Sequence, residues 1–204
     1  MTDSTRAQTP LDFAIAMGVF LVAVIFVFTF IPSMTTPYVE GNQDRSVTAN
    51  RVADHLSEGA LGDPADPFVL NGSCAEVFFN ESTVDGDIPS TCGYSGDNLS
   101  ERVGVNDDRL GVNVTVEQVD TTASGDDRFR TVCHTFQTSN GSVGVIHEEN
   151  ANFDCDTRYV AGDESGNQSS VVVARRIVTI PGCDFDTGST DVKSCDATLR
   201  VRVW

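Results

Sequence analysis

The sequence predicts an α+β protein in which an apolar N-terminal helix precedes a β-rich domain. Three observations predict this class. An uncharged apolar run covers residues 13–31, apolar residues repeat with helical spacing in residues 46–61, and short alternating runs between Gly, Asn and Asp fill residues 66–204. The expected order is a transmembrane helix continuing into an amphipathic helix, followed by an antiparallel β-rich extracellular domain.

The apolar run is long enough to cross a membrane as a helix. Its nineteen residues would span about 28 Å, close to the roughly 30 Å of bilayer hydrocarbon. We therefore expect residues 8–34 to form a single membrane span, with residues 1–7 as a cytoplasmic leader and membrane lipid as a partner. A conventional secretory signal peptide has a shorter core and a small-residue cleavage site. That reading and an uncleaved signal anchor stay open as alternatives.

A second helix is expected after the span. Pro32 and Pro37 should interrupt the first helix, so residues 35–65 are predicted to hold a linker and an amphipathic helix. In residues 46–61 apolar side chains recur at spacings of three and four, which is typical of a helix with one buried face. We expect a kinked or split helix rather than one continuous rod, with its soluble half packed on a sheet.

The remainder of the chain is predicted to consist of short strands and turns. The expected strands are residues 67–70, 75–79, 102–105, 111–119, 129–138, 142–148, 170–180 and 197–204. The fifth and sixth should form a hairpin around Asn140 and Gly141. The last two carry four arginines, Arg175, Arg176, Arg200 and Arg202. A solvated face, a cross-strand ladder with acids and a contact with a neighbouring subunit all stay open for them.

The charge is strongly acidic. The chain has 30 acidic and 13 basic residues among 204, a formal net charge of -17, and Lys193 is its single lysine. Such a surface suits concentrated salt, where screening removes most of the self-repulsion, so we expect a halophilic source. It also argues against nucleic acid as a partner, because no basic patch meets the phosphates.

Six cysteines lie after the apolar run and none before it. They are Cys74, Cys92, Cys133, Cys155, Cys183 and Cys195. An even number confined to the expected outer part predicts disulfides in an oxidising compartment. Fifteen pairings are possible, and three local couples in chain order are preferred. Zinc is the rival interpretation, which the absence of a C-x-x-C pair disfavours.

Six N-x-S/T sequons follow the span and make a glycosylated outer surface plausible. They begin at Asn71, Asn80, Asn98, Asn113, Asn140 and Asn167. Asn113 falls inside a predicted strand, so its use as an acceptor requires its side chain to lie on the solvent face. The strand register therefore decides that site.

No enzyme motif is present. The sequence has no G-x-S-x-G, P-loop or H-E-x-x-H. Cys133 and His134 are adjacent, so a strand would point them to opposite faces, which argues against a nucleophile and base pair. Acidic loops at residues 85–87, 125–127 and 184–191 lack a complete calcium-loop pattern, and solvated loops are the preferred interpretation. We expect no catalytic residue, no metal and no cofactor.

A basic-small pair and a carboxylate flank the start of the apolar run. Arg6 and Ala7 precede Gln8, and Asp12 is the fifth residue counted from Gln8. This pattern resembles the class III signal peptide of archaeal type IV pilins and archaellins. In that family prepilin peptidase cuts after the pair, the mature chain begins at Gln, and its fifth residue is acidic. The resemblance implies cleavage between Ala7 and Gln8 and a role for Asp12 in assembly.

The resemblance also implies a function. It implies a structural subunit, major or minor, of an archaeal type IV pilus-like filament, with prepilin peptidase and other pilin-like subunits as partners. The alternative is a single-span membrane protein whose extracellular domain binds a ligand or partner without polymerising. A hydrolase is the third and least favoured interpretation.

Overall fold

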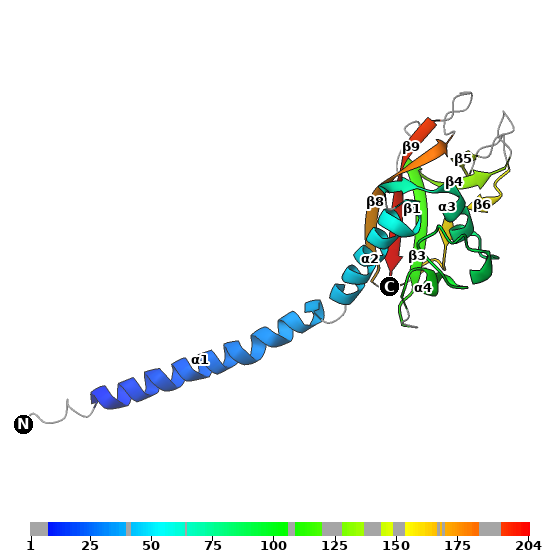
Figure 1. Cartoon of the computed structure of the whole chain (residues 1–204). Coiled ribbons are helices and arrows are strands. Elements are labelled where there is room, and N and C mark those ends of the chain that lie inside the picture. Colours follow the sequence, from blue (N-terminus) through cyan, green and yellow to red (C-terminus); the bar gives the residue numbers. More distant parts are fainter. Residues whose placement is uncertain are drawn as a thin grey trace, which may run out of the picture. The chain divides into compact units, whose positions relative to one another are not determined.

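The structure, a computed structural model, divides into two compact units, Met1–Asp44 and Arg45–Trp204. Figure 1 follows the elements along the chain. The described residues are 8–39, 42–63, 65–105, 109–119, 128–136, 144–148, 154–166, 168, 170–183 and 193–204. The first unit contains one long helix. The second contains most of another helix and all the strands.

The first unit is built on α1, Gln8–Val39. Within it, Asp12–Thr29 is long and apolar enough to cross a membrane, and none of that window is buried. The expected interruption at Pro32 and Pro37 is wrong, because α1 continues to Val39. A proline removes one backbone hydrogen bond, and the remaining bonds of a long helix can carry the chain past it.

The second helix, α2, Asn42–His55, ends in a π-helical turn, η1, Leu56–Ala60. Val52, Ala53 and Leu56 are fully or almost fully buried in the core of the second unit. Because these residues recur at helical spacing, they form one apolar face. The expected packing of this helix on the sheet is therefore confirmed, and the helix and the sheet belong to the same unit.

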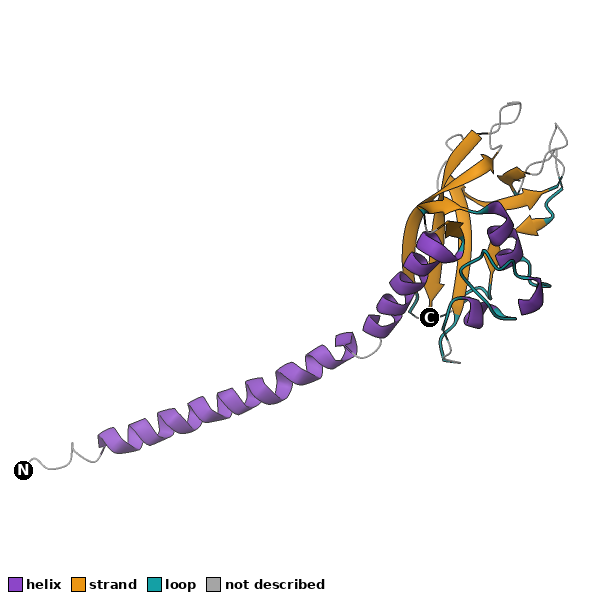
Figure 2. Cartoon of the chain, viewed as in Figure 1, coloured by secondary structure: helices purple, strands orange, loops and turns teal. Residues whose placement is uncertain are grey.

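The main sheet closes on itself. Hydrogen-bonded neighbours follow one another as β3, β4, β5, β8 and β9, and β9 pairs again with β3. These strands are Val112–Val119, Phe129–Thr135, Gly144–His147, Val172–Cys183 and Lys193–Val203. Figure 2 shows the strands curving round one another. The closure is thinnest between β5 and β8, which share the single pair Val145 and Cys183.

Four short strands complete the sheet. They are β1, Gly62–Asp63, β2, Asp66–Leu70, β6, Thr157–Arg158, and β7, Val160–Ala161. Most pairings are antiparallel, but β8 pairs in parallel with β2 and with β5. The expectation of an antiparallel sheet therefore holds only for most of it. The expected hairpin pairing of β4 with β5 is confirmed, and its turn lies outside the described residues.

Two expected strands do not form: one is helical, and the other is mostly a turn. Residues 75–79 belong to α3, Gly72–Phe79, and residues 102–105 follow from α4, Leu99–Arg102, into a turn. A 3-10 turn, η2, Asp85–Asp87, lies between them. The apolar side chains of α3 pack on the barrel, where the ring of Phe79 stacks on that of Tyr159 at 4.8 Å. A short apolar run fits either structure, and here packing favours the helix.

Candidate functional site

Exposed apolar side chains run along the Asp12–Thr29 part of α1. Phe20 is 60% exposed and Phe28 is 74% exposed, and the same holds for large apolar residues throughout the segment. Asp12, near its start, is also exposed. Of the expected processing residues, Gln8 begins α1, whereas Arg6 and Ala7 lie outside the described residues. This helix therefore requires an apolar environment that the described part of the chain does not supply.

The outer face of the β8–β9 ladder brings arginines together. Arg175 of β8 is directly opposite Arg200 of β9, and the next outward residue of β9 is Arg202. The residues between them, such as Ala174 and Val201, are buried in the core. Because strand residues alternate between faces, the three arginines share the outer face. Like charges directly opposite each other destabilise a sheet, so this pair has an energetic cost.

One arginine of this face has a partner. Arg200 forms an ion pair with Glu117 of β3, whose side chain is 7% exposed. Burial lowers the pKa of the Arg200 guanidinium from its ordinary value, Glu117 opposes that change, and Arg202 and Arg175 add to it. Among the residues with a described position, a single carboxylate thus pairs with this group of three guanidinium groups. The face keeps a local positive charge although the chain is strongly acidic.

The other two arginines have no polar partner within the part of the chain that the structure describes. Among the described residues, the guanidinium groups of Arg175 and Arg202 make no hydrogen bond or ion pair. Two apolar residues of β8 share their face, Val173 and Ile177, and Ile177 is 72% exposed. We name this surface, comprising Val173, Arg175, Ile177, Arg200 and Arg202, the arginine face. Arginine beside exposed apolar side chains is the composition typical of protein contact surfaces.

The fourth arginine of these strands has a structural role. Arg176 points to the opposite side of β8 and donates to Asp54 of α2 at 2.6 Å and to Asn50 at 3.1 Å. The hydrogen bond to Asp54 is the main cause that raises the pKa of Arg176. Arg176 therefore fixes α2 on the inner side of the sheet and does not belong to the arginine face.

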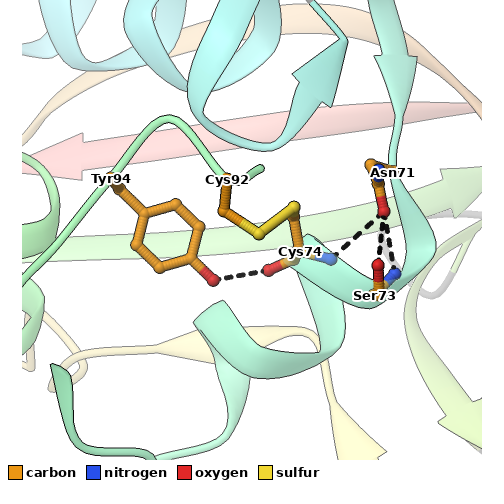
Figure 3. Close-up of a disulfide and its surroundings, with 5 residues drawn as sticks. All are labelled: Asn71, Ser73, Cys74, Cys92 and Tyr94. Carbon is orange, nitrogen blue, oxygen red and sulfur yellow. Dashed lines mark hydrogen bonds between the residues drawn. A yellow bond between two sulfur atoms is a disulfide. The ribbon is translucent and has the colours of Figure 1, made fainter. Parts of the chain in front are cut away.

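Three disulfides link the six cysteines in the couples that are adjacent in the sequence: Cys74–Cys92, Cys133–Cys155 and Cys183–Cys195. The first ties α3 to the loop that follows it. Figure 3 shows this bridge with Tyr94, whose hydroxyl donates to the carbonyl of Cys74 at 2.7 Å. Burial raises the pKa of Tyr94 to about 12, so the hydroxyl keeps its proton and the bond. The loop is thus held to α3 by a covalent and a polar link.

Three of the sequon asparagines are exposed and stand at helix ends. Asn71 caps α3, its Oδ1 accepting from the backbone N–H groups of Ser73 and Cys74 (Figure 3). Asn80 follows the same helix, and Asn98 caps α4. Each uses Oδ1 as the acceptor. This leaves Nδ2, the atom that carries an N-linked glycan, on the exposed side chain.

Asn113 has a different environment. It is 1% exposed, and its Nδ2 donates to the carbonyls of Ala161 at 3.3 Å and Gly162 at 3.0 Å. Its Oδ1 accepts from the hydroxyl of Thr115. The folded chain therefore offers no free acceptor nitrogen at this sequon, because the outward face of β3 is covered here. Asn140 and Asn167 lie outside the described residues.

The side chains that could act in catalysis or metal binding already contact other groups of the protein. Asp85, Asp97 and Glu101 line an open pocket, and each accepts a backbone N–H. Cys133 is bonded to Cys155, and Nε2 of His134 lies 3.9 Å from a carboxylate oxygen of Glu76. Within the described ranges, no three His, Cys, Asp or Glu side chains are grouped as metal ligands.

The fold and these surfaces define a protein with an apolar N-terminal helix of membrane-spanning length and a disulfide-linked, mostly β C-terminal domain. The chain belongs to the family described as a family of unknown function (DUF7287), whose model matches residues 4–204. No curated protein and no solved structure matches it.

Proposed function

We propose that this protein is a structural subunit of a pilus-like surface filament of the archaeal type IV class, held in the membrane before assembly. The observation that carries the proposal is the bare apolar surface of α1. Residues such as Phe13, Val19 and Phe28 are exposed on a helix that buries nothing against the described chain. Two environments cover such a helix, lipid before assembly and the helices of other copies in a filament.

The second unit supports the proposal because it has a hydrophobic core of its own. Its core contains α2, α3 and the inner face of the barrel, and it consists of residues from Ala49 to Val203. The domain is therefore complete as a folding unit. It would form the outer surface of the filament, where three disulfides and exposed sequons suit an extracellular position.

The energetic cost of burying the Asp12 carboxylate supports a role for it in assembly. A carboxylate near one end of an apolar helix is expensive to bury unless a cation pairs with it. Cleavage between Ala7 and Gln8 would create an α-amino group at the start of a neighbouring helix. That group is a cation at the N-terminal end of a helix, the end at which Asp12 lies. Its pairing with Asp12 of another subunit would set the stagger between subunits.

The first test is the N-terminal residue of the native protein, identified by mass spectrometry of its terminal peptide. We expect a start at Gln8, and we expect shearing of cells to release the protein in filaments. The variant Asp12→Ala should remain in the membrane and lose the filaments, whereas Asp12→Glu should retain them because it keeps the charge. A normal yield of filaments from Asp12→Ala would contradict the assembly role of this carboxylate.

A second candidate function is favoured by the arginine face. An exposed basic and apolar surface on a membrane-anchored domain also fits a single-span protein that binds an extracellular ligand or partner without polymerising. A start at Met1 or Thr2, together with retention of the protein in membranes after shear, would favour this alternative. Neither role requires a catalytic residue, so we propose that the protein is not an enzyme.

A further inference from the structure

We propose that the arginine face is a docking surface for the acidic surface of a second copy of this chain. The inference rests on the proposed filament role and names the face of the β domain that joins neighbouring subunits. Its core is the opposed pair Arg175 and Arg200, with Arg202 beside them on β9. These strands lie side by side in the second unit (Figure 1).

The energetic cost of the face is the first argument. Arg175 and Arg200 lie opposite each other across the ladder, which places two like charges side by side, and of the two only Arg200 has a carboxylate partner within the described residues, that of Glu117. An acidic residue opposite each arginine would remove the repulsion, and the chain contains 30 acidic residues. An external anion that meets Arg175 and Arg202 would remove it as well.

Charge complementarity identifies the occupant. The chain carries a net charge of -17, so a second copy is acidic overall and attracts the arginine face. In concentrated salt the range of this attraction falls to a few ångströms, about 3 Å at 1 M. Only direct contacts then remain effective, and arginine suits them because it donates two parallel hydrogen bonds to one carboxylate.

Apolar side chains add a second source of contact energy. Ile177 is the most exposed large apolar residue among those described in the β domain, and Val173 and Ile177 flank Arg175 on the same strand face. At the neighbouring strand, Phe68 of β2 is exposed and is the sole described non-glycine residue with positive φ, 69°. Burial of such residues stabilises a contact in high salt, where long-range electrostatics is weak.

The contact must be between different faces of the two copies. An arginine face cannot meet itself across a twofold axis, because the guanidinium groups would repel one another. A basic face that docks on an acidic face instead makes a head-to-tail contact, and such contacts repeat from copy to copy as an open helix unless the rotation between copies closes them into a ring. The open helix is the geometry that a filament requires.

Cross-linking of two isotopic forms tests the docking without requiring filaments. The full chain with Arg175→Lys, prepared with ¹⁴N and with ¹⁵N, is reconstituted together in vesicles of phosphatidylcholine and treated with a zero-length carbodiimide. Because Lys193 is the chain's single lysine, the substitution adds one amine to the surface. We expect mixed-isotope peptides that join the introduced amine to an Asp or Glu of the other form.

The matched control is Arg158→Lys. Arg158 lies on β6 and pairs with Glu148 of its own copy at 2.7 Å. Its introduced amine should couple to Glu148 within one isotopic form, which shows that the reagent works. Coupling of the Arg175→Lys amine only within one isotopic form, or equal mixed-isotope yields from both variants, would overturn the docking proposal.

Charge reversal in the native host tests its use in assembly. The double variant Arg175→Glu, Arg202→Glu spares the buried pair of Arg200 with Glu117, so the fold and its disulfides should persist. We expect the yield of sheared filaments to fall at least about tenfold, and Arg158→Glu to change it less than about twofold. Unchanged yield from the double variant would overturn the docking proposal while leaving the filament intact. Mixed-isotope cross-links in a protein that never forms filaments would instead uphold the docking and overturn the filament.

Discussion

Arg176 of β8 and Asp54 of α2 form an ion pair of 2.6 Å between two residues separated by 122 positions in the sequence. Asn50, one turn earlier on α2, accepts a second hydrogen bond from the same guanidinium. The pair fixes the helix against the inner side of the sheet at the point where the apolar face of α2 meets the core. The neighbouring Arg175 points outward, and no described residue pairs with its guanidinium group in this way.

Removal of this pair should loosen α2. We expect Arg176→Ala to lower the free energy of unfolding by about 1 kcal/mol, because the side chains are partly exposed and solvent screens the pair. Chemical denaturation of the full chain in detergent, followed by circular dichroism, measures the change. Arg158→Ala, which removes an exposed pair on β6, should cost less than about 0.5 kcal/mol. Equal losses in both variants would contradict the anchoring role of Arg176.

The disulfides should differ in what they contribute. Cys74–Cys92 closes a loop of 18 residues outside the sheet, whereas Cys183–Cys195 joins two strands that are already paired. For a loop of this length we expect the double variant Cys74→Ala/Cys92→Ala to lose about 3 kcal/mol of unfolding free energy. The double variant Cys183→Ala/Cys195→Ala should lose less unfolding free energy, because the β8–β9 ladder already holds these two strands together. Denaturation midpoints of the two double variants measure the difference, and the reverse order would refute it.

Glycan mapping should separate the sequons by burial. Mass spectrometry of peptides from the native host is expected to find glycans at one or more of Asn71, Asn80 and Asn98, and none at Asn113. Asn113→Ala should cost about 2 to 3 kcal/mol, because the carbonyls of Ala161 and Gly162 lose a buried donor. Asn98→Ala is the exposed comparison, with an expected cost of about 1 kcal/mol for the lost helix cap. An occupied Asn113 would contradict this fold of β3.

The raised pKa of Tyr94 predicts how the stability of the domain changes at high pH. Its pKa is raised by burial from 10.0 in the unfolded chain to about 12 in the folded one. Between these values the unfolded chain releases its proton first, so the contribution of Tyr94 to stability is complete below pH 10 and is lost as the pH rises toward 12. Unfolding midpoints measured from pH 9 to 12 should fall less steeply in Tyr94→Phe than in the unaltered chain. Parallel curves for the two would contradict this assignment.

Much of the sheet could be predicted because its strands alternate. In β9, Leu199, Val201 and Val203 are buried while Arg200 and Arg202 are partly exposed, as the alternation indicates. The apolar face of α2 was predictable for the same reason, since its period is helical. Periodicity cannot say which strands become neighbours. The opposition of Arg175 and Arg200, and with it the arginine face, therefore required the register.

The wrong predictions of secondary structure and burial have local causes. Residues 75–79 are too short for their apolar pattern to distinguish strand from helix, and the signal that decides is the capping side chain of Asn71 four residues earlier. The outward face of β3 contains Asn113, Thr115 and Glu117, which alternation assigns to solvent, yet all three are buried. The two-residue strand β7 pairs with β3 there, and its length gives no periodic signal.

The place of β9 within the barrel decides when the domain can fold. This strand lies between β3 and β8, and its pairing with β3 joins residues about 90 positions apart, such as Val112 and Val203. A chain without residues 193–203 leaves one edge of β3 and one edge of β8 without the ladder that β9 supplies, although β3 still pairs with β4 and β7 and β8 with β2 and β5. Ring closure over so long a segment is slow compared with hairpin formation. The barrel therefore closes last, when the C-terminal strand joins β3 and β8.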